Sequence, residues 1–191
     1  MHQRGFRLIA SLFILSIVLF GFTFIKQGND EFLAYQVTIV GYAFALYFLH
    51  RQFRFSNLTL GGMTLLAIMH MLGGVDFGYG LIYGKMLFPI GNLPIFRYDN
   101  LVHFYGTFMV AWVLHQMIQP SLKRDGILPH LIIALGALGI GAVVEITEFF
   151  VALSTPHNFV GDVTNTSLDL VFNSLGAITA MLVSSYREWR K

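Results

Sequence analysis

The sequence predicts an all-α membrane protein whose helices cross the bilayer several times, and three observations lead to this fold class. Of its 191 residues, 55% are hydrophobic and only 12% are charged, with a mean hydropathy of +0.66, unlike a soluble domain. Apolar runs close to the roughly 20 residues that a spanning helix needs recur along the chain. Basic residues form short clusters between these runs, which argues against a nucleic-acid-binding face.

Six spans are expected, which together form a single transmembrane domain over residues 1–191. Their boundaries are expected at residues 8–26, 32–50, 58–75, 99–118, 128–153 and 167–186. The first apolar run is long, and its C-terminal flank offers a poor cleavage site, so a retained span is favoured over a cleaved signal peptide. The third run is rich in glycine and therefore the weakest of the six.

The distribution of basic residues predicts the orientation. With the N-terminus inside, nine of the twelve Lys and Arg residues fall on the inner side. The outer side then holds only Lys26, Lys85 and Arg97. Because basic residues are retained on the cytoplasmic side, we expect a multi-pass protein of the bacterial inner membrane with both termini in the cytoplasm.

The longest segment between spans covers residues 76–98. It is rich in glycine and aromatic residues, and it is too apolar for a solvated loop. A loop lying in the membrane interface is the favoured interpretation, because Tyr and Phe rings are stable there. A lid over a site is the alternative, which requires that protein covers its backbone.

Acidic residues concentrate at the outer side. Six of the ten lie there or in the outer part of a span: Asp76, Asp99, Glu145, Glu148, Asp162 and Asp169. Only Lys85 and Arg97 accompany them, so the region is expected to bind a cation, to share protons, or both. Asp30 and Glu31, in the first outer loop, are interpreted as exposed acids.

The fifth span carries Glu145 and Glu148 about one to two turns below its outer end. An acid at the centre of a span costs roughly 2.5 to 3.5 kcal/mol, and less near the ends, so both must face the interior and have partners. A protonated or arginine-paired structural acid is the alternative to a functional one. No arginine lies at a matching depth, which favours function.

The fourth span begins with Asp99, and His103 follows one turn deeper on the same face. Asp99 is expected to cap the helix at the rim of the site or to orient a substrate. His103 has the depth of the two glutamates. A histidine beside carboxylates is typical of a metal ligand or a proton relay, although a hydrogen-bonded core histidine is the alternative.

The sixth span places Asp169 and Asn173 on one face, inside the apolar run, where both need partners across the bundle. Asn165 or Thr166 is the expected helix cap. Asp162, in the preceding segment, is expected to help orient a substrate. His70, near the outer end of the third span, is only a secondary candidate, because a lone histidine there is more often structural.

The chain has no cysteine, so a metal must be held by His, Asp, Glu or Asn. The expected ligands come from the last three spans, with His70 as a secondary candidate: His103, Glu145, Glu148 and Asp169. Oxygen-rich ligation favours Mg or Mn, and the histidine keeps Zn or Fe open.

The segment Tyr98-Asp99-Asn100-Leu101-Val102-His103-Phe104, the Glu145 segment and the run from Asp169 to Ala177 resemble the VanZ-like membrane proteins. That pattern has a Gln three residues after the glutamate. Here Glu148 occupies this position, so the chain resembles the YjdF-like inner-membrane family more closely. The resemblance covers the last three spans. It implies a multi-pass inner-membrane protein, with a link to glycopeptide resistance for VanZ itself, and it implies no established reaction.

Three functions are compatible with these residues. The first is an envelope hydrolase or transferase acting on a lipid or lipid-linked substrate. In this enzyme His103, Glu145 and Asp169 hold a cation or act as acid and base, while Glu148 and Asn173 orient ligands. The second is a proton- or ion-coupled transporter, although the inner halves of the last three spans contain no acid. The third is a non-catalytic scaffold or binding subunit whose polar cluster fastens helices together.

Overall fold

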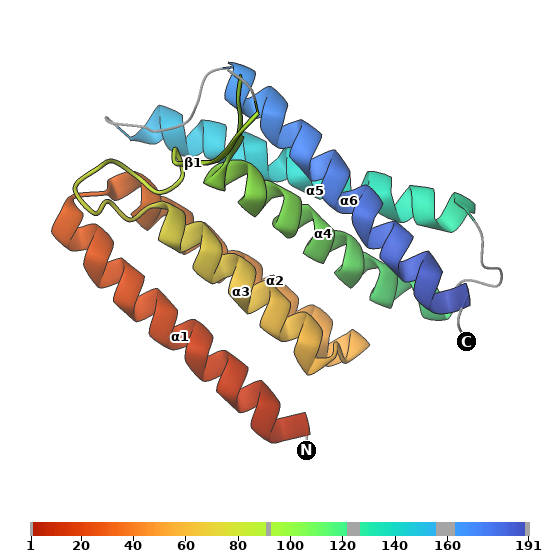
Figure 1. Cartoon of the computed structure of the whole chain (residues 1–191). Helices are drawn as coiled ribbons and strands as arrows, with labels where there is room; N and C mark the ends of the chain where they lie inside the picture. Colours follow the sequence, from red (N-terminus) through yellow and green to blue (C-terminus); the bar gives the residue numbers. More distant parts are fainter. Residues whose placement is uncertain (1, 91–92, 122–126, 156–162, 190–191) are drawn as a thin grey trace. The chain divides into compact units, whose positions relative to one another are not determined.

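The structure, a computed structural model, describes residues 2–90, 93–121, 127–155 and 163–189, and most of these residues are α-helical (Figure 1). Six α-helices occur in chain order: α1 (His2–Gln27), α2 (Asp30–Phe53), α3 (Asn57–Gly73), α4 (Tyr98–Ile118), α5 (Ile127–Ser154) and α6 (Val163–Trp189). A short 3-10 helix, η1 (Gln119–Ser121), follows α4. The all-α class predicted from the sequence is confirmed.

Five of these helices are long and apolar enough to cross a membrane: α1, α2, α4, α5 and α6. Helix α3 is apolar but has only 17 residues. It corresponds to the glycine-rich run that was the weakest predicted span. Its length is shorter than the roughly 20 residues that span an average hydrocarbon core without tilt or thinning.

The described residues group into two compact units. The first unit comprises Met1–Asp99 and Thr147–Val160, and the second comprises Asn100–Ile146 and Gly161–Lys191. The division falls inside the first turn of α4 and inside α5. The expectation of a single transmembrane domain, like the orientation of its termini, stays a prediction.

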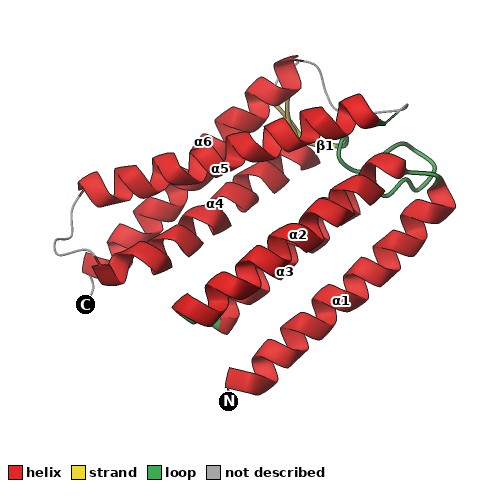
Figure 2. Cartoon of the chain, turned by 180° about the vertical axis from the view of Figure 1, so that it is seen from behind, coloured by secondary structure: helices red, strands yellow, loops and turns green. Residues whose placement is uncertain are grey.

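The first unit has an aromatic core, in which Phe24 and Phe32 pack with Tyr35, Met71 and Val75. Helices α1, α2 and α3 run alongside one another within it (Figure 1, Figure 2). The α1–α2 turn is tied to the end of α3 by Asn29. Its side chain accepts a hydrogen bond from the Phe32 N–H at 3.1 Å and donates one to the Gly74 carbonyl at 2.9 Å.

The prediction that Glu31 is an exposed acid is wrong. Glu31 is 2% exposed, whereas its neighbour Asp30 is exposed as expected. Glu31 lies on the same face of α2 as Tyr35, one turn further on, and the Tyr35 hydroxyl donates to Glu31 Oε1 at 3.0 Å. Asp30 and Glu31 are adjacent, so they point to different sides of the helix, and only one of them faces the core.

The segment expected to be an interfacial loop contains a β-hairpin of two antiparallel strands, β1 (Met86–Ile90) and β2 (Leu93–Arg97). The two strands are the only ones among the described residues, and they are the yellow segments of Figure 2. Before the hairpin, the chain is held by a bond from the Tyr83 N–H to the Gly73 carbonyl at 2.9 Å. The lid interpretation of this segment stays a prediction.

The second unit has a core of small residues from α4, α5 and α6: Ala111, Ala134, Ala137, Ala177 and Ala180, joined by Ile133 and Met181. The closest approach is at Gly176, where an added Cβ would lie 2.1 Å from the backbone oxygen of Phe104. Small side chains allow such close approach of membrane helices. The polar side chains of the same three helices are thereby brought within reach of one another.

Candidate functional site

The centre of the candidate site is the imidazole of His103, on the second turn of α4. His103 is 7% exposed. Its Nδ1 lies 3.2 Å from Oε1 of Glu145 on α5, and its Nε2 lies 4.0 Å from Oδ1 of Asp169 on α6. The ring therefore lies between carboxylates of α5 and α6, the two other helices of the second unit.

Asp169 is held in one orientation by two side-chain amides. It is 1% exposed, and its Oδ1 accepts a hydrogen bond from Nδ2 of Asn100 on α4 at 2.9 Å. Its Oδ2 accepts a second bond, at 2.7 Å, from Nδ2 of Asn165, one turn earlier on α6. An ionised carboxylate oxygen can accept more than one bond, so these two hydrogen bonds are compatible with a role of Asp169 as a ligand.

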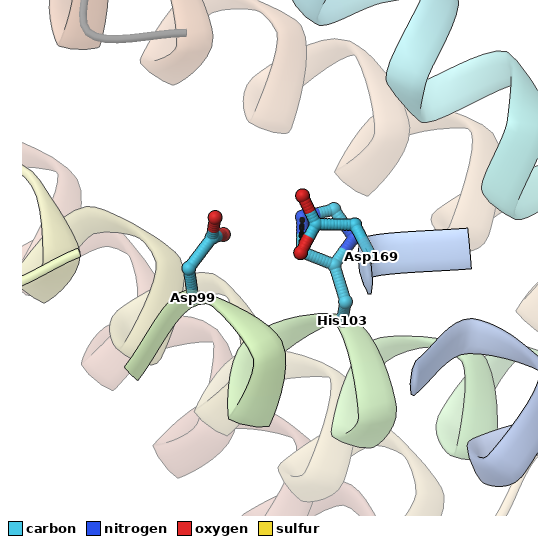
Figure 3. A group of neighbouring side chains, drawn as sticks. All are labelled: Asp99, His103 and Asp169. Carbon is cyan, nitrogen blue, oxygen red and sulfur yellow. Dashed lines mark ion pairs between the residues drawn. The ribbon is translucent and has the colours of Figure 1, made fainter. Parts of the chain in front are cut away.

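Asp99 lies one turn before His103 on α4. The helix begins at Tyr98, so Asp99 is part of the first turn and does not cap it, and at 6% exposure it is not a rim residue. An acid in the first turn still interacts favourably with the helix dipole. Asp99, His103 and Asp169 each offer one ligand atom, and these three atoms lie within 4.8 Å of one another. Figure 3 draws the three side chains.

A second polar layer follows one turn further into the helices of the second unit. Thr107 of α4 donates a hydrogen bond from Oγ1 to Oδ1 of Asn173 on α6 at 2.5 Å. On α5 the corresponding position is Gly141, where an added Cβ would lie 3.1 Å from Nδ2 of Asn173. The first layer takes His103, Glu145 and Asp169 from α4, α5 and α6. The second layer takes Thr107, Gly141 and Asn173 from the same helices, each four positions away from its counterpart in the first layer.

Three further site residues were predicted: Glu148, His70 and Asp162. Glu148 falls in the part of α5 that belongs to the first unit, where it is half-buried and interacts electrostatically with Tyr35. His70, also in the first unit, has its Nδ1 2.5 Å from the Tyr83 hydroxyl. Asp162 lies outside the described residues. Their predicted functional roles stay predictions.

Sequence reasoning missed three residues of the site: Asn100, Thr107 and Asn165. Asn100 precedes His103 by three positions and Thr107 follows it by four, so helical spacing places both near the histidine face. Asn165 was predicted as a cap, but α6 begins at Val163, and Asn165 faces Asp169 from within the helix. The spacing was visible in the sequence, whereas the partners on another helix were not.

Comparison with known proteins provides a family for this chain. The model of a family described as "Predicted membrane protein (DUF2238)" matches residues 8–190. An uncharacterized protein of Thermotoga maritima is 31% identical over 88 residues, which cover 44% of this chain and 46% of that protein, less than half of either. No solved structure matches the chain. Because the family model spans nearly the whole sequence, the chain belongs to the DUF2238 family of predicted membrane proteins.

Proposed function

We propose that this protein is a multi-pass protein of the bacterial inner membrane that binds a divalent cation between His103, Asp169 and Asp99. With this cation it acts as a hydrolase or transferase on a lipid or lipid-linked substrate of the envelope. Membership of DUF2238 supports the membrane location. The resemblance to YjdF-like and VanZ-like proteins supports an envelope role.

The observation that carries the proposal is the 4.0 Å separation between His103 Nε2 and Asp169 Oδ1. This separation is too long for an N–H···O hydrogen bond, which measures about 2.7 to 3.2 Å. Two ligand atoms that each lie about 2.1 Å from one ion are separated by roughly 3 to 4 Å. The spacing therefore suits a shared cation better than a direct contact.

The opposite edge of the imidazole supports the same assignment. A histidine that binds a metal through one nitrogen usually donates its other N–H to a carboxylate, which fixes the tautomer and the ring orientation. Glu145 Oε1 lies 3.2 Å from His103 Nδ1, an ion-pair contact within reach of this role rather than an aligned hydrogen bond. We therefore assign Glu145 as the positioning residue of His103, and Asn100 and Asn165 as the residues that orient Asp169.

The ligand set of two carboxylates and one imidazole suits Mg, Mn or Zn and leaves coordination positions open for water or substrate. A cation bound there would supply Lewis-acid activation of a substrate oxygen or of water. The chain's own residues contribute the orientation of the ligands and their exclusion from bulk water, since His103 and Asp169 are 7% and 1% exposed.

The depth of the site favours a substrate with a polar head group. His103 is five residues from the start of α4 and Asp169 six from the start of α6, which corresponds to about 8 to 9 Å along each axis. In a hydrocarbon core about 30 Å thick, this depth lies near the head-group boundary. A lipid could present its phosphate or ester at this level without leaving the bilayer.

The metal content of the purified protein tests the proposal. Protein in detergent, dialysed against Mg, Mn, Zn or Fe and then desalted, is expected to retain about one equivalent of one metal by mass spectrometry. His103→Ala and Asp169→Ala should reduce this to background, while His115→Ala, at the other end of α4, should retain it. Wild-type protein without metal under every condition would overturn the cation site.

A non-catalytic scaffold is the second candidate, and the bond from Asn100 to Asp169, which joins α4 to α6, favours it. Thermal unfolding separates the two candidates. If Asp169→Asn unfolds the protein and no metal is found in the wild type or in any variant, the polar cluster serves to hold α4 and α6 together. If His103→Ala folds normally and loses its metal, the site serves a ligand.

A further inference from the structure

We infer that the side-chain amide of Asn173 donates a hydrogen bond to a phosphoryl oxygen of the ligand, so that the site accepts phosphate-bearing molecules. The inference rests on the proposed function, because the same ligand would bind the cation in the layer above. It names the substrate class of that site, which the cation ligands alone leave open.

The first observation is a buried donor. Asn173 is 2% exposed, and its Oδ1 already accepts the Thr107 hydroxyl at 2.5 Å. Its Nδ2 has no hydrogen-bond partner among the described residues. A buried N–H without an acceptor lowers stability, so such groups in folded proteins generally have a ligand, an ion or a water as partner.

The second observation is the position of this donor. Asn173 lies one turn beyond Asp169 on α6, and Thr107 lies one turn beyond His103 on α4. The α5 position of this layer is Gly141, which contributes no side chain, and the Asn173 amide lies against it. The layer therefore contains one unused donor and no charged side chain, directly below the proposed cation ligands.

Distance decides which ligand can reach both layers. Asp169 and Asn173 are four residues apart on α6, so their backbones are separated by a rise of about 6 Å along the helix axis. A water bound to the cation can accept a hydrogen bond only from a donor within about 5 Å of the cation. This distance is the sum of a metal–oxygen bond of about 2.1 Å and a hydrogen bond of about 2.9 Å. A tetrahedral phosphoryl group binds the cation through one oxygen and presents another oxygen beyond it. A phosphoryl group therefore extends from the cation to the second layer. A hydrogen-bond donor that points at a negatively charged oxygen is the usual way in which a site that excludes water stabilises an anion.

The test uses Mn²⁺-loaded protein in a phosphate-free maltoside detergent, titrated with inorganic phosphate. We expect calorimetric binding, and broadening of the ³¹P resonance because the phosphorus lies close to Mn²⁺. Asn173→Leu, which is similar in size but has no donor, should weaken phosphate binding about tenfold and keep about one Mn²⁺ per chain. Ser184→Ala, which alters another buried polar residue of α6, should leave both quantities unchanged.

A second variant, Asn173→Asp, keeps an acceptor for Thr107 and replaces the donor by a negative charge. It should weaken phosphate binding at least as much, and it decides the question if Asn173→Leu does not fold. A short-chain phosphatidate tests the source of the phosphate, since tighter binding than inorganic phosphate indicates a lipid and equal binding indicates the phosphate group alone.

Two results would overturn the inference while leaving the cation site intact. One is Mn²⁺-loaded wild-type protein that binds neither phosphate nor phosphatidate. The other is unchanged phosphate affinity in both Asn173 variants. Absence of Mn²⁺ from the wild-type protein would instead remove the proposed function, and the inference with it.

Discussion

His70 of the first unit and His103 of the second both lie in apolar helices, and they have different partners. In the first unit, His70 Nδ1 lies 2.5 Å from the Tyr83 hydroxyl, and the rings of Phe32 and Tyr35 lie 5.9 and 5.5 Å from its own. In the second unit, His103 lies between two carboxylates. A neutral hydroxyl beside aromatic rings suits a structural histidine, whereas two acids beside a histidine suit a cation or a proton.

The difference follows from how the helices pack. The core of the first unit is built from large rings, and its buried acid Glu31 accepts a hydrogen bond from Tyr35, four residues away on the same helix. The core of the second unit is mostly alanine, and two hydrogen bonds between side chains of α4 and α6 join residues 69 and 66 positions apart. Small side chains thus allow distant segments to build one polar site.

The largest expected effect is that of Gly176→Ala in the second unit. The new methyl group would lie 2.1 Å from the Phe104 backbone oxygen, and a backbone atom cannot move aside as a side chain can. Helices α4 and α6 would have to separate, at a cost of about 3 kcal/mol or more. Thermal unfolding in detergent measures this effect, and metal content should fall with it.

The matched control for this change is Gly139→Ala, on α5 of the same unit. Nothing lies within 4 Å of the added methyl, so stability should stay the same or rise slightly. Equal losses in Gly139→Ala and Gly176→Ala would contradict the close helix contact.

Asp169→Asn should have the next largest effect. It replaces a charged acceptor by an amide whose NH₂ must face one of the two donors, Asn100 or Asn165. The loss of a buried charged hydrogen bond corresponds to about 2 to 3 kcal/mol, measured by denaturant unfolding, and metal binding should be lost as well. Stability and metal content equal to the wild type would show that neither amide bond matters.

The counterpart in the first unit is Glu31→Gln, which should cost less. Its amide oxygen can still accept the Tyr35 hydroxyl, so a change below about 1 kcal/mol is expected, with no loss of metal. Comparison of Glu31→Gln with Asp169→Asn under one denaturant protocol tests whether the two buried acids differ as the structure suggests. A larger loss for Glu31→Gln would reverse the comparison.

Tyr83→Phe should have the smallest effect. It removes only the hydroxyl that His70 contacts, while the ring packing of the first unit remains, so the expected loss is about 0.5 to 1.5 kcal/mol. Amide exchange at the Tyr83 N–H, which donates to Gly73, should become faster. A loss of metal in this variant would be inconsistent with a purely structural His70.

Much of the candidate site was visible in the sequence because intramembrane acids and histidines are rare and stand out in apolar runs. His103, Glu145, Asp169 and Asn173 were predicted from their depth and spacing. In the proposed site Glu145 orients His103, whereas the sequence suggested a metal ligand or an acid–base residue at this position. The sequence gives the depth of a carboxylate within a span, but it does not indicate which of the two ring nitrogens of a histidine that carboxylate will face.

The sequence by itself determined the fold class and the helix positions, because both depend on the lengths and composition of local apolar runs. Only the tertiary structure decided that Glu31 is buried, that a hairpin precedes α4, and that Asn100 and Thr107 bond to residues of α6. These features depend on which faces of distant helices meet. Close packing at positions such as Gly176 determines which faces meet. Because Gly176 has no side chain, α6 can approach the backbone of α4 at Phe104, and this approach brings the polar groups of the two helices together.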